Sequence, residues 1–227
     1  MTIRVKLYTA IVVSVAGLAL TAGVGIWSLT RVADRFDAVQ KAADSRALAL
    51  QLKFDVTDFN GWQTAYGYDD GRSRPVYLAA IARYHRTFAR ARAALRRPDE
   101  QAGLRRLGAA VAAFEQLDRR AWVALRAGRK DEVKRLLLGP EIAIFQRAAA
   151  AAEELARAEE AFAQREERRF RDARDDALRF LVAAAVVAAL LVAILLVTAL
   201  DLARLAERRL AQPLGEAGAG DEAGPAT

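Results

Sequence analysis

A polar and aromatic stretch in the first third of the chain carries the residues best suited to bind a small molecule. The run from Asp58 to Tyr66 reads DFNGWQTAY. Amides and hydroxyls can donate and accept hydrogen bonds, and indole and phenol rings can stack on a flat ligand. Four residues of this run are predicted ligand contacts: Asn60, Trp62, Gln63 and Tyr66. The alternative is that the two rings form a helix–helix interface and the two amides pair across it.

Gly61 stands in the middle of this run. A glycine inside a helix costs about 1 kcal/mol relative to alanine, so we expect a packing or functional reason for it. The predicted reason is the close approach of a neighbouring helix or of a ligand.

Arginines form the second group of candidate ligand residues. Two sets are each close in sequence: Arg119, Arg120 and Arg126 in one, and Arg83, Arg86 and Arg90 in the other. A guanidinium binds a carboxylate or phosphate through two parallel hydrogen bonds. Arg119 and Arg126 are therefore predicted to contact a small anionic ligand, and the alternative is a solvated charged face.

The composition argues against catalysis and against cofactors. One histidine and no cysteine exclude zinc, iron–sulfur and haem sites built on those ligands. No nucleophile elbow, P-loop or HExxH motif occurs. Adjacent carboxylates such as Glu153–Glu154 and Glu159–Glu160 are expected at surface positions, with no pocket to shift their pKa. We predict no enzyme, no cofactor and no metal, and we expect His85 at the surface.

Two uncharged apolar segments must be placed before any site can be. Residues 7–30 and 180–200 each match the roughly 20 residues that a helix needs to cross a bilayer. Both are predicted transmembrane helices. A cleaved signal peptide is the alternative for the first, and a buried soluble helix is the alternative for the second.

Basic residues set the predicted topology. Arg4 and Lys6 precede the first apolar segment, and Arg204, Arg208 and Arg209 follow the second. The positive-inside rule then places residues 1–6 and 201–227 in the cytoplasm and residues 31–179 outside it. We predict a two-pass protein of the bacterial inner (plasma) membrane. The net charge of +7 would suit nucleic acid, but most arginines are then extracytoplasmic, so no nucleic-acid partner is predicted.

The region between the apolar segments shows the spacing of four amphipathic helices. Apolar residues recur at steps of three and four in four runs, namely Val32–Tyr66 (including Phe36 and Ala43), Tyr77–Leu95, Leu104–Leu125 (including Leu117) and Ile144–Phe162 (including Ala158). Breaks are expected at Gly71, Pro98, Gly128 and Gly139–Pro140, with a short helix over 131–138. The predicted fold is all-α, an antiparallel four-helix bundle flanked by two transmembrane helices. Its base is expected to be a two-helix stalk, because the middle helices are shorter.

Three stretches resemble the sensory half of the bacterial chemoreceptors, the methyl-accepting chemotaxis proteins. The first is LALQLKFDVTDFNGWQTAYGYD, which begins at Leu48. The second, AGRKDEVKRLLLGPEIAIFQRAAAAAEEL from Ala127, is similar to the family's turn, short helix and fourth-helix start. The third, ARLAERRLAQPL from Ala203, is similar to the opening helix of the HAMP linker. The resemblance covers nearly the whole chain.

The resemblance implies a homodimeric sensor whose four-helix bundle binds a small ligand between helices. It also implies that the ligand shifts the fourth helix and that this shift crosses the membrane. The sequence departs from the family after residue 200. Residues 201–214 are expected to form only a partial HAMP-like helix and residues 215–227 a disordered tail, without the family's cytoplasmic output domain. The alternative function is a non-sensing, membrane-anchored interaction module, or a heterodimer partner of a full-length chemoreceptor.

Overall fold

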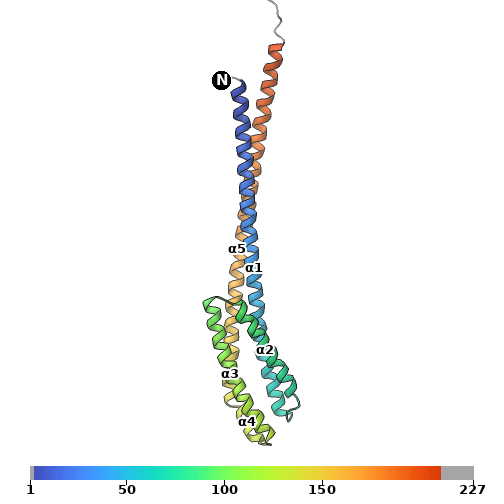
Figure 1. Cartoon of the computed structure of the whole chain (residues 1–227), viewed down its shortest axis with the longest axis vertical. Coiled ribbons are helices and arrows are strands. Elements are labelled where there is room, and N and C mark those ends of the chain that lie inside the picture. The colour runs from blue at the N-terminus through green and yellow to red at the C-terminus, as the bar shows by residue number, and fades with distance from the viewer. Residues whose placement is uncertain (1–2, 211–227) are drawn as a thin grey trace, which may run out of the picture. The chain divides into compact units, whose positions relative to one another are not determined.

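The computed structural model describes residues 3–210, apart from the side chains of residues 3–7, 10, 202, 205, 206 and 208–210. Within this range there are five helices and no strand: α1 (Ile3–Tyr68), α2 (Arg74–Ala94), α3 (Pro98–Arg126), α4 (Lys130–Leu137) and α5 (Pro140–Leu210) (Figure 1). The prediction of an all-α chain is confirmed. The predicted tail at 215–227 and residues 211–214 of the partial HAMP-like helix lie outside the described residues.

Glycine and proline end and begin the helices where the sequence predicts it. Gly71, in the turn after α1, has φ +90°, and Gly128, after α3, has φ +73°. Both values lie in the left-handed region that glycine adopts without a Cβ clash. Pro98 and Pro140 are the first residues of α3 and α5, where a missing N–H costs no helical hydrogen bond.

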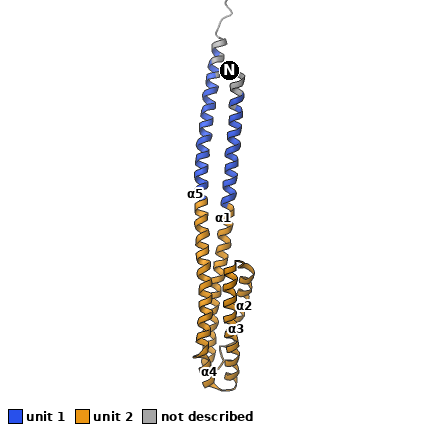
Figure 2. Ribbon diagram, turned by 90° about the vertical axis from the view of Figure 1, so that its left-hand side faces the viewer, with its two compact units in different colours: residues 1–32, 174–227 blue, residues 33–173 orange. Residues whose placement is uncertain are grey.

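The chain divides into two compact units, residues 1–32 with 174–227 and residues 33–173 (Figure 2). The unit 33–173 holds one main hydrophobic core, to which α1, α2, α3 and α5 all contribute. The ring of Phe59 lies at its centre, with its centroid 5.6 Å from Tyr84 and 5.0 Å from Phe114. These three rings join α1, α2 and α3. A second cluster packs α4 on α3 through Leu117, Ala121, Ala124, Val133, Leu136 and Leu137.

The predicted apolar faces are buried along most of α2 and α3. In α1 and α5, three residues that were predicted to lie on a buried face do not. Phe36, Ala43 and Ala158 are exposed. Beyond the α2–α3 connection, α1 and α5 run on without α2 and α3 (Figure 2). Phe36 packs on Phe170 at 6.0 Å between centroids, and Arg35 pairs with Glu166 at 4.0 Å. In α5 the buried face continues after Leu155 through Glu159 rather than through Ala158.

The described part of the unit 1–32 with 174–227 consists of two apolar helical segments, the first part of α1 and the last part of α5. The helices that contain them are long and apolar enough to cross a membrane, by length and composition, and 6% and 0% of their most apolar windows are buried. The two segments touch each other: the rings of Trp27 and Phe180 lie 6.2 Å apart. Gly17 leaves room for the side chain of Leu191, which a Cβ at that position would meet.

Candidate functional site

A buried polar centre lies at the end of the core where α1 ends and α5 begins. We call it the Asp118 centre, and its members come from four helices: Gln63 and Tyr66 (α1), Arg74 (α2), Asp118 (α3) and Glu141 (α5). Gln63 and Tyr66 are fully buried, and Asp118 and Glu141 are each 3% exposed. Buried polar groups destabilise a fold unless they are paired. The hydrogen-bond and charge partners of each member therefore decide whether it is free to bind a ligand.

Asp118 is the acceptor around which the centre is built. Its Oδ1 accepts a hydrogen bond of 2.6 Å from Nη1 of Arg74 and a short one from the hydroxyl of Tyr66. Burial alone would lower the pKa of Arg74, but the hydrogen bond and charge of Asp118 raise it overall. Arg74 and Asp118 therefore form a largely buried ion pair.

Three aromatic rings surround the guanidinium of Arg74. Its Cζ lies 4.7 Å from the ring centroids of both Tyr66 and Tyr77 and 4.9 Å from that of Trp122. A cation over such rings is attracted by their negative faces. Burial, followed by the charge of Asp118, raises the pKa of both tyrosines, so their hydroxyls stay protonated. The cage of aromatic rings is thus filled by a residue of the chain itself.

Glu141 is the one acid of the centre without a cationic partner among the described residues. Burial, with a contribution from the charge of Asp118, raises its pKa to about 8. The positive end of the α5 helix dipole favours the charged form of this first-turn carboxyl. This effect is too small to offset the loss of hydration on burial. Near neutral pH Glu141 is therefore mostly protonated.

The amide of Gln63 lies between the two acids and can take two orientations. In one, its nitrogen donates to Asp118 Oδ1 at 3.3 Å and its oxygen faces Glu141. In the other, its nitrogen donates to both carboxyl oxygens of Glu141, at 3.1 Å for Oε2. The first orientation suits a protonated Glu141, whose O–H then donates to the amide oxygen. The second suits an ionised Glu141, but it turns the amide oxygen towards Oδ1 of Asp118, which is also an acceptor.

A cavity of about 220 Å³ adjoins Glu141 between α1 and the start of α5. We call it the Glu141 cavity. Its lining residues are Asn60, Thr64 and Tyr68 of α1, Leu137 of α4, Leu138, and Glu141, Ile142 and Phe145 of α5. Drug-sized ligands occupy pockets of roughly 300–1,000 Å³. This cavity therefore suits a ligand with only a few heavy atoms.

The predicted ligand residues do not form one site. Gln63 and Tyr66 belong to the Asp118 centre, and Asn60 lines the Glu141 cavity. Trp62 lies on the outer side of α1, where it is 38% exposed and donates to Asp58 at 3.2 Å. It lines an open groove formed by α1 alone, together with Gly61. A Cβ on Gly61 would meet nothing within 4 Å, so no neighbouring helix in the described part of this chain approaches Gly61 closely, and the approach of a ligand there stays a prediction.

The predicted arginine contacts lie elsewhere. Arg119 and Arg126 are both exposed on α3, and neither has an ion pair within the described part of the chain. The structure does not bring either of them to the Glu141 cavity. Arg83, from the second set, instead ties α2 to α1: its Nε donates to Asp55 at 3.0 Å and its Nη2 pairs with Asp58.

The expectation of an exposed Glu159 with an ordinary pKa is wrong. Glu159 is fully buried in α5, where Arg97 pairs with it at 2.6 Å. Burial raises the pKa of Glu159 to about 7, although Arg97 opposes this rise. The guanidinium of Arg97 also lies 3.8 Å from the ring centroid of Phe162. The α2–α3 connection is thereby fastened to α5. His85 is exposed as expected, 2.5 Å from Glu115.

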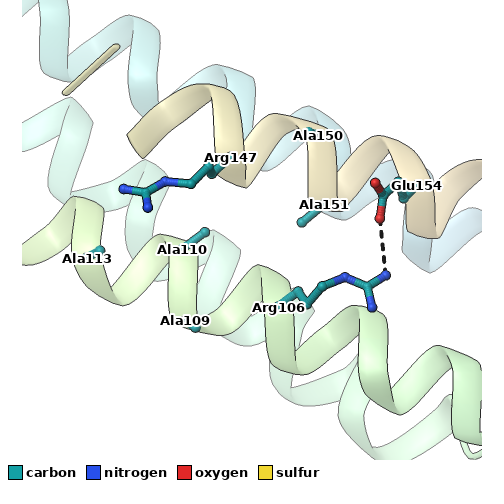
Figure 3. Close-up of a pocket in the computed structure, with 8 residues that line it drawn as sticks. All are labelled: Arg106, Ala109, Ala110, Ala113, Arg147, Ala150, Ala151 and Glu154. Atoms are coloured by element: carbon teal, nitrogen blue, oxygen red, sulfur yellow. Dashed lines mark hydrogen bonds and ion pairs between the residues drawn. The ribbon is translucent and has the colours of Figure 1, made fainter. Parts of the chain in front are cut away.

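A wider groove of about 480 Å³ runs between α3 and α5. Figure 3 shows its alanine lining and the Arg106–Glu154 ion pair, 3.1 Å long, that crosses one end. Arg147 lies towards the other end (Figure 3). Arg106 and Glu154 pair with each other, and Arg147 has no ion pair within the described part of the chain. The groove is open and lined mainly by alanines, so it encloses a small molecule less than the Glu141 cavity does. No cluster of three or more metal-ligating residues occurs among the described residues.

No protein-family model matches the chain, and no curated protein or solved structure matches it. Function is therefore inferred from the geometry.

Proposed function

We propose that this chain is a transmembrane sensor of the chemoreceptor type. Residues 31–179 form an extracytoplasmic antiparallel four-helix bundle that binds a small molecule, and both termini lie in the cytoplasm of a bacterial inner membrane. One observation carries the proposal. Helices α1 and α5 each run without a break from a core with a buried polar centre into an apolar segment long enough to cross a membrane.

The Glu141 cavity is the proposed binding site because its lining includes the first residues of α5. A ligand held between Asn60 of α1 and Glu141 of α5 changes the contact between these two helices. A helix shift of about 1–2 Å can travel along a continuous helix as a rigid displacement. The free energy available for the shift is the difference in the ligand's affinity for the two arrangements.

The proposed sensor is a homodimer that pairs through α1. Within residues 43–68 this helix exposes a set of apolar or small residues that we call the α1 stripe: Ala43, Ala47, Leu50, Phe54, Gly61 and Tyr68. Their separations of three, four and seven follow a heptad, the repeat of paired helices. A second copy anchored in the same membrane would present the same stripe at the same height and in parallel. Self-pairing would therefore match the two stripes in register.

The α1 stripe is also the observation that favours a second candidate function, a membrane-anchored interaction module that pairs with a different receptor. Co-purification separates the two. A full-length receptor recovered in equal amount with the chain from its native membrane favours the module, and recovery of the chain paired only with itself favours the homodimer.

A chimera tests the sensor function directly. Residues 1–214 are fused to the cytoplasmic half of a characterised chemoreceptor, and kinase output is measured against amines, amino acids, organic acids, phosphate and sugars. We expect at least one compound to change the output. Insertion of Gly-Gly between Arg179 and Phe180 should abolish that response by breaking the helix, whereas Ala-Ala at the same place controls for the added length. A chimera with a working kinase that responds to none of the compounds would contradict the proposal.

A further inference from the structure

We propose that the Glu141 cavity binds the ammonium group of a small organic amine. This inference rests on the proposed sensor function and names the ligand class for that same site. The ligand's ammonium group would pair with Glu141, and its short apolar part would pack against the hydrophobic lining of the cavity.

Charge is the first argument. Glu141 is the only charged residue among those that line the cavity. It is 3% exposed, and no lysine, arginine or histidine of the described residues forms an ion pair with it. The nearest cation of the polar centre, Arg74, is held by Asp118 at 2.6 Å and by three rings. A buried carboxylate without a counter-charge is costly, which is why Glu141 keeps its proton, and a cation in the cavity would stabilise the ionised form.

The composition of the lining is the second argument. Besides Glu141, the side chains of Asn60 and Thr64 offer oxygen acceptors, which matches the three N–H donors of a primary ammonium. The other walls are apolar: Leu137, Leu138, Ile142 and Phe145. An anionic ligand finds no basic side chain in this lining. A neutral ligand would leave the carboxyl of Glu141 without a cation.

The surroundings of Glu141 also predict a proton signature. Gln63 on α1 lies against its carboxyl, and the charge of Asp118 on α3 acts on it. Burial with the charge of Asp118 keeps Glu141 mostly protonated near pH 7. An ammonium ion favours the ionised carboxylate, so its binding releases a proton. Affinity should then rise up to about tenfold per pH unit below pH 8 and level off above it.

The test uses the full chain in lipid nanodiscs and isothermal titration calorimetry with three probes of equal length. These are n-butylammonium, butan-1-ol and butyrate. We expect n-butylammonium to bind at least tenfold more tightly than the other two. At pH 7, titrations in two buffers of different ionisation enthalpy should report release of close to one proton. Equal binding of the three probes, preference for butyrate, or binding without proton release would overturn the proposal.

Variants locate the site. Glu141→Gln should weaken n-butylammonium binding at least tenfold and remove the proton release. Glu132→Gln is the matched control, because Glu132 lies on the surface of neighbouring α4 and pairs only locally, with Arg129 at 3.2 Å. Ile142→Trp is a second variant that leaves Glu141 in place, fills the cavity and should also abolish binding. Wild-type binding in both Glu141→Gln and Ile142→Trp would overturn the proposal.

The two proposals can fail separately. If n-butylammonium does not bind but another compound drives the chimera, the sensor function stands and the amine assignment falls. If binding depends on Glu141 but no compound drives the chimera, the cation site stands and signalling through α5 falls.

Discussion

Arg74, in the first turn of α2, donates to Oδ1 of Asp118 in α3 over 2.6 Å while its guanidinium stays within 5 Å of three ring centroids. The side chain of Arg74 is 13% exposed and that of Asp118 is 4% exposed. The pair therefore ties the α1–α2 turn to α3 at one end of the core, and water cannot take the place of either residue without opening that end.

Arg74→Ala should destabilise the fold strongly. The substitution leaves Asp118 buried without its cation, and breaking a buried pair in this way costs about 3–5 kcal/mol. Thermal and urea unfolding of the full chain in detergent, followed by circular dichroism, measure the loss. Adding Asp118→Asn should restore a large part of it, since the neutral amide needs no counter-charge. If the double variant is as unstable as the sum of the two single variants, the two residues are not coupled.

Glu141 should make the fold less stable as the pH rises. Its pKa is about 8 in the folded chain and 4.5 without the burial. Below pH 4.5 both states are protonated and its favourable contribution is complete. Between pH 4.5 and pH 8 only the unfolded state loses the proton, so that contribution declines by up to about 1.4 kcal/mol per pH unit. Above pH 8 the decline stops.

Comparison of melting temperatures isolates this effect. From pH 5 to pH 8 the melting temperature of Glu141→Gln should rise relative to that of the wild type. Above pH 8 the difference between the two melting temperatures should stay constant. Glu132→Gln is the control for the loss of a carboxyl that pairs only locally, with Arg129. Parallel curves for Glu141→Gln and the wild type would show that the carboxyl of Glu141 titrates normally.

Single cysteines should map the α1 stripe in a homodimer. The chain has no cysteine of its own, so each substitution gives a unique thiol. Cysteine at Leu50, Phe54 or Gly61 should form a disulfide between two copies under mild oxidation in membranes, because parallel paired helices bring equivalent Cα atoms within about 7 Å. Cysteine at the exposed Arg86 of α2 is the control. Equal cross-linking at all four positions would indicate random collision instead of a defined interface.

The two left-handed glycines should differ in their tolerance of alanine. Gly71→Ala puts a Cβ 3.0 Å from the ring of Trp122 at a φ of +90°. Gly128→Ala has a φ of +73° and nothing within 4 Å. Gly128→Ala should lower the free energy of unfolding by about 1–2 kcal/mol, which is the cost of a left-handed backbone for a residue with a Cβ. Gly71→Ala should lower it by more, because the Cβ also meets Trp122. Equal losses in unfolding free energy would mean that Trp122 moves aside freely.

Helix breaks and buried faces follow from the sequence because glycine, proline and apolar spacing act locally. Tyr66 lies on the predicted apolar face, and a step of four from Phe59 leads to Gln63 on the same face. Trp62 precedes Gln63 directly, and adjacent residues lie about 100° apart on a helix, which is enough to place Gln63 in the core and Trp62 outside it. Arg119 follows Asp118 directly and is exposed for the same reason.

Asp118 and Glu141 escaped the sequence analysis although a signal for both existed. Steps of four from Phe114 and of three from Ala121 both lead to position 118, and a step of three before Ile144 leads to position 141. Each is a polar residue at a core position of the heptad. Selecting only apolar residues led to Leu117 and left out the acids. Arg74 could not be found by periodicity at all, because its place depends on the turn at Gly71.

The short link between α2 and α3 has a consequence for the order in which the chain folds. Only Leu95–Arg97 separate these two helices, so contacts such as the ring of Phe88 against Gly108 close a small loop. Ion pairs between α1 and α5, such as Lys53–Glu153 at 2.5 Å, close a far longer one, with a larger loss of chain entropy. We therefore expect the α2–α3 hairpin to form early and to serve as the surface on which α1, made first, and α5, made last, come together.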